Sequence, residues 1–234
     1  MALPKITHPV YKITVPSTKK QLSFRPYTVR EEKLLLMIKD DESIQEKIDV
    51  LKQVIVNCCV EDIDVSKLAI FDIEYIFIKM RAKSVGEIIE LNYTKENNRT
   101  TFDVDLNRVE VKFDPNHKRQ FLLSGDIGVN MNYPTFDSMV KMDEMVANNQ
   151  NVDDFVFDMF IDCIDTVFDN EKVYKEFTKD ELSEFVLSLP RDSIDNIKNF
   201  FETMPVLEHQ VPVKFKDGTT EVVTMRGLKD FFIF

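Results

Sequence analysis

The sequence DVSKLAIFDIEYIFIKMRAKSVGEIIEL, residues 64–91, predicts the element around which the chain folds. Apolar residues recur every three or four positions from Ile70 to Met80, and they extend well beyond a single stripe. This pattern is typical of a helix that is covered on most sides. We expect Ser66 to cap the start of the helix and Gly86 to end it. Alternating apolar and polar residues after Gly86 then predict a strand, and nothing on the helix has the character of a catalytic group.

Length, composition and charge limit the class of protein. The chain has 234 residues, of which 44% are hydrophobic, so it is long enough to bury a core as one large or two small domains. A formal net charge of −11 at pH 7 argues against a general binder of nucleic acid or anionic membranes and favours basic partners. The N-terminus lacks the apolar segment of a signal peptide, and no run is long enough to span a membrane. We therefore expect a soluble intracellular protein.

Residue types that carry chemistry are few and scattered. The three cysteines are Cys58, Cys59 and Cys163. The three histidines are His8, His117 and His209. An odd number of cysteines without CxxC spacing favours reduced, buried thiols over a disulfide framework or a zinc site. The chain also lacks the short motifs of phosphate binding, dinucleotide binding and hydrolase catalysis, so we expect no catalytic residue, no metal and no cofactor.

The order of helical and strand patterns predicts an α+β fold, with a mainly helical body, a small antiparallel β insert and a C-terminal β-hairpin. We expect five consecutive parts. They are an extended N-terminal arm with a hairpin at residues 1–27, a first helical part at 28–86, the β insert at 87–133, a second helical part at 134–204, and the hairpin with an apolar tail at 205–234.

Local signals predict several helix starts and one turn. Thr28 with Glu31, and Ser43 with Glu46, have the spacing of a capping box. Thr135 or Ser138 is expected to cap a later helix. An Asp-Gly pair at residues 217–218, between two alternating runs, is the strongest hairpin signal in the chain.

A candidate partner-binding feature is an acidic stripe in the expected helix at residues 151–168. Its members are Asp154, Asp158, Asp162, Asp165 and Asp169. Steps of three and four residues place them on one helix face with no lysine or arginine among them, and their mutual repulsion costs stability. Two interpretations stay open: a solvated face, or a docking surface for a basic partner.

The chain ends in FFIF, residues 231–234, which is too apolar to extend freely into water. Either Phe231, Phe232 and Phe234 pack under the preceding hairpin, or they insert into another chain. The second alternative makes these phenylalanines candidate partner-binding residues.

Several blocks carry a resemblance to a known family. They are RPYTVREEK at 25–33 followed by LLLM, NCC at 57–59, FDIEYIF at 71–77, RAKSVG at 81–86, DIG at 126–128, NYP at 132–134, FFETMP at 200–205 and GLKDFF at 227–232. In this order they resemble the baseplate hub assembly proteins of T-even-type contractile-tailed bacteriophages.

This resemblance implies a non-enzymatic late protein that binds hub or tape-measure proteins during tail assembly in the host cytoplasm, either as a chaperone or as a hub subunit retained in the virion tail. An intracellular enzyme is the alternative from another class. Many relatives carry CxxC pairs in two hairpins, but the equivalent segments here, residues 92–102 and 214–222, contain no cysteine. The resemblance therefore implies no zinc in this chain.

Overall fold

The computed structural model describes residues 4, 6–38, 44–95, 98–215 and 218–231. The chain divides into two compact units. Unit 1 comprises residues 1–112 and 206–234, and unit 2 comprises residues 113–205. Unit 1 is therefore assembled from two segments that are distant in sequence, whereas unit 2 is continuous.

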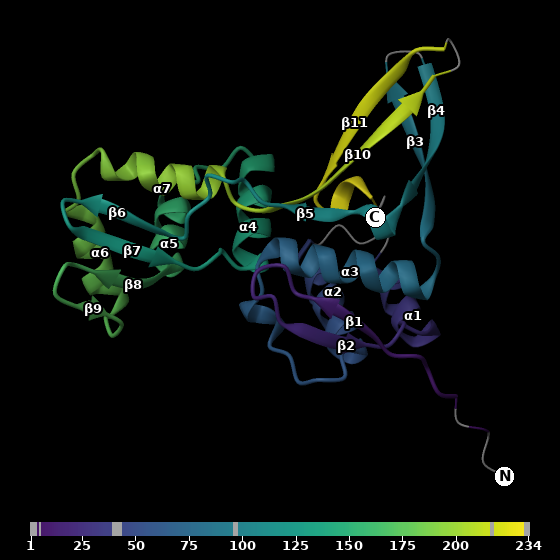
Figure 1. Cartoon of the computed structure of the whole chain (residues 1–234), viewed down its shortest axis with the longest axis horizontal. Coiled ribbons are helices and arrows are strands. Elements are labelled where there is room, and N and C mark those ends of the chain that lie inside the picture. Colours follow the sequence, from purple (N-terminus) through teal and green to yellow (C-terminus); the bar gives the residue numbers. More distant parts are fainter. Residues whose placement is uncertain (1–3, 5, 39–43, 96–97, 216–217, 232–234) are drawn as a thin grey trace. The chain divides into compact units, whose positions relative to one another are not determined.

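Unit 1 contains three helices and three antiparallel sheets in its described residues (Figure 1). The helices are α1 (Val29–Met37), α2 (Ile44–Cys58) and α3 (Ile70–Ser84). The strands are β1 (Tyr11–Thr14), β2 (Gln21–Phe24), β3 (Ile88–Lys95), β4 (Asn98–Asp105), β5 (Glu110–Lys112), β10 (Val206–Lys214) and β11 (Thr220–Arg226). β1 pairs with β2, β3 pairs with β4, and β10 lies between β11 and β5.

Unit 2 contains four helices and one four-stranded sheet in its described residues. The helices are α4 (Phe136–Ala147), α5 (Asp153–Cys163), α6 (Lys179–Leu187) and α7 (Ser193–Glu202). The antiparallel sheet has the order β6 (Gln120–Ser124), β7 (Ile127–Met131), β8 (Ile164–Phe168) and β9 (Val173–Tyr174). Helix α7 lies along β6, where Ser193 and Asn196 donate hydrogen bonds to the carbonyls of Leu123 and Leu122.

The predicted mainly helical body with one β insert is wrong. The strands expected in the insert belong to three different sheets: β3 pairs with β4, β5 joins the C-terminal strand β10, and β6 and β7 begin the sheet of unit 2. Two further strands follow α5: β8, where helix was expected, and β9, for which no element was predicted. The fold is mixed α+β, because strands far apart in sequence pair with one another, and local periodicity carries no information about such pairing.

The expected central helix is present as α3, but it starts later than predicted. Residues Val65–Lys67 form a separate 3₁₀ turn, and the carboxylate of Asp64 accepts from the backbone N–H of Ser66. Helix α3 begins at Ile70, and the Asp72 carboxylate accepts from the N–H of Ala69 at its start. Ser66 is therefore not its cap. Nine of the fifteen residues of α3 are buried, which explains why its apolar surface is wider than one stripe.

Two buried carboxylates on α3 bind segments from opposite ends of the chain. Asp72 is fully buried and accepts from the backbone N–H and the hydroxyl of Ser17, at 2.9 and 2.5 Å, in the turn between β1 and β2. Glu74 accepts from the N–H of Leu228 at 2.8 Å, just after β11. Because a buried acceptor needs a donor, these bonds fix both chain ends against α3.

Two further polar side chains of α3 hold loops. The ammonium group of Lys79 donates to the carbonyls of Leu106, Asn107 and Val109, at 3.1, 2.7 and 2.8 Å. The hydroxyl of Ser84 accepts from the N–H of Tyr27 at 2.9 Å, immediately before α1. Helix α3 is therefore the element to which the other segments of unit 1 are attached.

Other predicted local features are confirmed. The capping box of Thr28 and Glu31 starts α1, and Thr135 caps α4. The N-terminal hairpin β1–β2 and the C-terminal hairpin β10–β11 both form. Ser43 and Asp217 lie outside the described residues. All three cysteines are free thiols, with Cys58 and Cys163 buried, and burial raises the pKa of Cys58 to about 11.

Candidate interaction surfaces

The acidic stripe is not a single helix face. Helix α5 ends at Cys163, so only Asp154, Asp158 and Asp162 lie on it, whereas Asp165 lies in β8 and Asp169 follows that strand. The sequence after Cys163, IDTVF, is rich in β-branched residues, and it pairs with β7. The predicted helix at residues 151–168 is therefore wrong in its last five residues.

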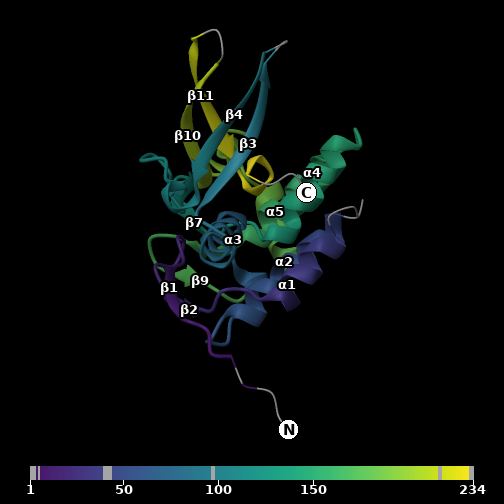
Figure 2. The ribbon, with the colours of Figure 1, turned by 90° about the vertical axis from the view of Figure 1, so that its right-hand side faces the viewer.

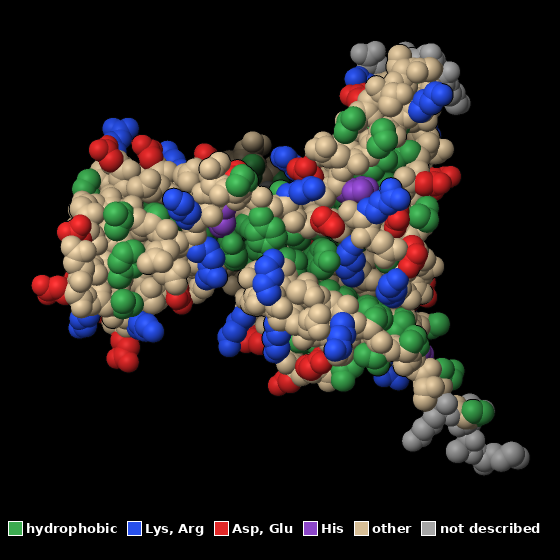
Figure 3. Space-filling model, in the orientation of Figure 1, with side chains coloured by type: hydrophobic (Ala, Val, Ile, Leu, Met, Phe, Trp, Pro, Cys, Tyr) green, Lys and Arg blue, Asp and Glu red, His purple; other side chains and the backbone are tan. Residues whose placement is uncertain are grey.

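Basic and polar side chains of unit 2 contact the stripe. The ammonium group of Lys179, at the start of α6, lies 3.0 Å from Asp162 and 3.7 Å from Asp158, and Asp162 is the main reason that its pKa is raised. No lysine or arginine lies between these aspartates in the sequence, but the fold brings Lys179 of α6 to two of them. On the face seen in Figure 3, acidic side chains of unit 2 are interspersed with basic ones.

The other two aspartates have structural partners. The carboxylate of Asp165 accepts from the side-chain amides of Asn130 and Asn132, both at 3.2 Å. Asp169 accepts from the backbone N–H groups of Glu171 and Lys172 and from the hydroxyl of Tyr174, and these bonds lower its pKa. Asp165 therefore links β8 to the end of β7, and Asp169 stabilises the turn between β8 and β9. Asp154, Asp158 and Asp162, the α5 aspartates, are exposed and are the members of the stripe that share one helix.

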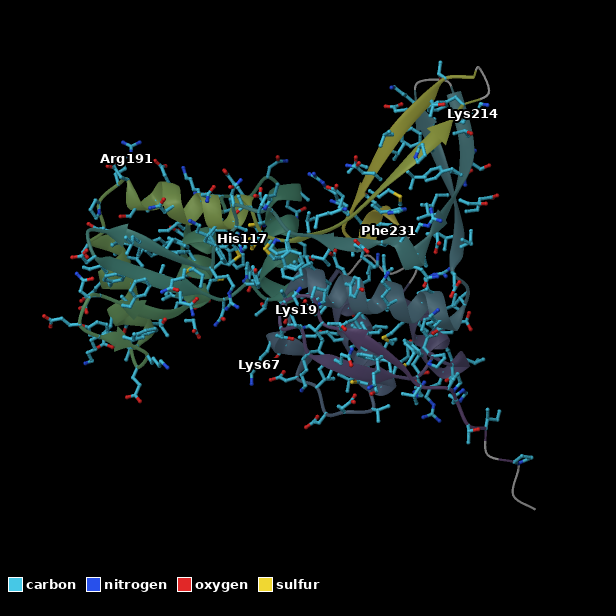
Figure 4. All side chains as sticks on the ribbon, viewed as in Figure 1. Lys19, Lys67, His117, Arg191, Lys214 and Phe231 are labelled. Carbon is cyan, nitrogen blue, oxygen red and sulfur yellow. The ribbon has the colours of Figure 1, made fainter. Side chains whose placement is uncertain are left out.

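Of the three candidate phenylalanines at the C-terminal end, the structure describes Phe231. Phe231 follows a 3₁₀ turn at Leu228–Asp230 and is only 1% exposed (Figure 4). Its side chain is part of the core of unit 1, so insertion into another chain would require it to leave that core. Phe232 and Phe234 lie outside the described residues.

Two hairpins of unit 1, β3–β4 and β10–β11, lie side by side, as Figures 1 and 2 both show. Lys95 forms an ion pair with Glu221 at 2.8 Å, and the rings of Tyr93 and Phe215 lie 6.0 Å apart. The hydroxyl of Thr100 donates to a carbonyl of β10 at 3.3 Å. These contacts join the two hairpins to each other.

One aromatic group in unit 2 has no counterpart among the predicted site residues. The ring of His117 stacks on Tyr133 and lies against Phe200, with centroids 5.6 and 5.2 Å apart. Its Nδ1 lies 2.9 Å from the hydroxyl of Thr203, which itself donates to the carbonyl of Asn199. Nδ1 is therefore the donor and carries the proton.

The other ring nitrogen of His117, Nε2, is buried and has no hydrogen-bond partner among the described residues. Desolvation lowers the pKa of His117, the charge of Arg119 lowers it further, and Asp114 opposes both. The arrangement favours the neutral ring, which suits a packing role. Nothing in the sequence around His117 indicates this stack, because the ring partners of His117 are up to 83 positions away.

Within the described part of the chain, no three histidine, cysteine or acidic side chains are grouped closely enough to hold a metal ion. The described helices also include none with the length and hydrophobicity needed to cross a membrane.

Comparison with known proteins identifies the family. The sequence model of a family described as T4 bacteriophage base plate protein matches residues 8–233. No curated protein and no solved structure matches the chain significantly. The family match covers most of both segments of unit 1 and the whole of unit 2. The chain therefore belongs to the family of T4 bacteriophage base plate proteins.

Proposed function

We propose that the chain is a non-enzymatic assembly factor of the baseplate hub, which binds hub or tape-measure proteins while the phage tail is built. Membership of the base plate family gives the protein a structural or assembly role in the baseplate and partners among the other tail proteins. The observation that carries the finer proposal is the match over residues 8–233, together with the sequence blocks that resemble hub assembly proteins.

The α5 aspartates supply a contact of definite chemistry for such a partner. Asp154, Asp158 and Asp162 are exposed on one side of α5, and Lys179 contacts only the last two. A basic surface on a hub or tape-measure protein would attract these carboxylates over a distance comparable with the Debye length, which increases the rate of encounter.

Co-expression tests the proposal. The chain is produced with each hub protein and with the tape-measure protein of the same phage, one at a time, and complexes are isolated through a tag on the partner. We expect stable co-purification with at least one of them. If none of these proteins retains the chain, the proposed role in hub assembly is wrong.

A charge variant tests the contact. D154N/D158N/D162N should slow association with the captured partner, most strongly at low salt. The matched control is E90Q/D103N/D126N, which removes the same number of exposed negative charges elsewhere. Equal association rates for the two variants would show that the α5 aspartates form only a solvated face.

A second candidate function is a structural hub subunit that stays in the finished tail. The same family match supports it, since base plate proteins include structural components. The two candidates differ in the number of copies per virion, because a retained subunit is present in every particle.

A further inference from the structure

The outer edge of β11 is regular and has no strand paired to it among the described residues. Strand β11 pairs with β10 along its whole length, from Glu208 with Arg226 to Lys214 with Thr220, without any shift of register. Among the described residues no strand lies on its other side. A regular strand with one open side presents unpaired backbone donors and acceptors.

The ladder shows which backbone groups point outward. The N–H of Phe215 donates to the carbonyl of Thr219, and the N–H of Gly227 donates to the carbonyl of Leu207. Because bonded and non-bonded pairs alternate in an antiparallel ladder, the even-numbered residues of β11 direct their N–H and C=O groups away from β10. These residues are Thr220, Val222, Thr224 and Arg226.

One end of this edge is closed. The outward N–H of Arg226 donates to the carboxylate of Asp230 at 2.6 Å. For Thr220, Val222 and Thr224, no described residue donates to or accepts from the outward backbone groups. The open part of the edge therefore extends from Thr220 to Thr224.

The far edge of β10, by contrast, is protected. β5 covers its first residues, Val206 to Glu208. Farther along, Pro212 has no N–H to offer, and the carbonyl of Lys214 accepts from the hydroxyl of Thr100. Proline, bulges and lysine are the usual means of blocking a strand edge. β11 contains none of them, and its Val222 side chain is 60% exposed.

We propose that the outer edge of β11 pairs with the same edge of a second copy of this chain, antiparallel across a twofold axis at Val222. The order Thr, Val, Thr at positions 220, 222 and 224 reads the same in both directions. Pairing about Val222 places Val222 against its own copy and Thr220 against the copy's Thr224. Each of these pairs exchanges two backbone hydrogen bonds, and Val–Val and Thr–Thr are favourable cross-strand neighbours.

The charges near the edge agree with this pairing. Glu221, on the other face of β11, is placed opposite Val223 of the copy and is held by Lys95 of its own chain. No like charges are therefore directly opposed, despite a net charge of −11. The pairing buries less surface than stable interfaces do, so the dimer is weak and depends on concentration. This inference does not depend on which tail protein the chain binds.

Single cysteines test the register. In a C59S background, V222C places two thiols opposite each other on the axis, at a Cα separation of about 5.5 Å that a disulfide can span. T220C and T224C each face a threonine of the copy, so neither cross-links alone, but an equal mixture of the two does. We expect about tenfold more covalent dimer from V222C than from T220C after mild oxidation.

Proline at position 222 provides the second test. V222P removes an outward N–H and leaves the ladder to β10 intact, so it should shift sedimentation toward monomer at concentrations where the unmodified chain dimerises. V222A keeps that N–H and should still dimerise. The cysteine variants keep the backbone unchanged, so they remain decisive if V222P does not fold.

Two results would overturn the proposal. One is equal cross-linking of V222C, T220C and T224C, which indicates random collision. The other is absence of cross-linking in V222C, whether the chain sediments as a monomer or dimerises through another face.

Discussion

The two units of this protein are stabilised in different ways. Unit 1 joins residues 1–112 to 206–234 around α3, whose buried or half-buried polar side chains bind the backbone of four separate segments. Unit 2 is a continuous segment with an apolar core, in which Phe200 contacts several other rings. Its buried polar contacts are fewer, with the hydroxyl of Ser193 on the carbonyl of Leu123 as the clearest.

This difference shows what each kind of interaction contributes. Apolar packing is not directional, and it suffices where helices and strands follow one another along the chain. A hydrogen bond from a buried side chain to one particular carbonyl or amide also specifies which segment lies where, because any other placement leaves a polar group unsatisfied. The segments of unit 1 that are far apart in sequence need that specification.

The largest expected effect is the same in both units. F77A in α3 and F200A in α7 each remove a ring that is at most 3% exposed, and each should destabilise its unit by roughly 3–5 kcal/mol. Denaturant unfolding gives the loss, and hydrogen exchange by segment shows which unit has lost protection. A loss below about 1 kcal/mol for F77A would mean that this side of α3 is not core.

Removal of a polar side chain of α3 should destabilise unit 1 more than removal of a comparable side chain destabilises unit 2. K79M keeps the length of the side chain but removes the donor to three carbonyls, and we expect a loss of about 1–3 kcal/mol. The matched control is K198M on the exposed surface of α7, which should change the free energy of unfolding by less than about 0.5 kcal/mol. Equal effects of the two variants would contradict the polar attachment of unit 1 to α3.

As the pH falls, the contribution of His117 to the stability of unit 2 should be lost before the contribution of Glu31 to the stability of unit 1. The pKa of His117 lies below its ordinary value of 6.5, so the stabilisation from the neutral ring is complete above pH 6.5 and is lost as the pH falls below that value. Burial raises the pKa of Glu31, but hydrogen bonds from Arg25 and Thr28 outweigh it and lower the pKa to about 2. Its contribution is complete above pH 4.5 and is lost between pH 4.5 and 2.

Hydrogen exchange by segment between pH 7 and 5 measures this difference. The segment around His117 should lose protection after correction for the intrinsic exchange rate, and the segment around Glu31 should not. H117F keeps an aromatic ring in the stack without a titrating group, so it should abolish the loss in unit 2. If H117F leaves the pH dependence unchanged, another group is responsible.

The smallest effect is expected at the α5 aspartates. D158N/D162N removes both carboxylates that contact Lys179, but all three side chains are more than half exposed. Solvent screening makes such pairs weak, and removing the repulsion between the aspartates compensates part of the loss. The free energy of unfolding should change by less than about 0.5 kcal/mol. Unfolding of this variant would show that the aspartates hold α5 and α6 together.

Local features were predictable from the sequence, and long-range pairing was not. The capping box of Thr28 and Glu31 and the hairpin β10–β11 follow from residue types a few positions apart. The pairing of β5 with β10 joins residues about a hundred positions apart, and no local pattern in either segment predicts it. The end of α5 at Cys163 was missed because spaced aspartates continue the helical period into a strand.

The candidate site shows the same limit. The position of Asp154 and Asp158 on one helix was correctly predicted, but the contact with Lys179 depends on how α5 and α6 pack. The open edge of β11 is also invisible in sequence, because only the ladder to β10 shows which backbone groups point outward.

Quantitative mass spectrometry of purified virions, set against tail intermediates from the infected cell, tests the assembly-factor proposal most directly. The intermediates should contain the chain bound to a hub or tape-measure protein, and the virions should contain less than one copy per particle. A fixed number of copies in every virion, comparable with that of the other hub proteins, would contradict the proposal and establish a retained structural subunit.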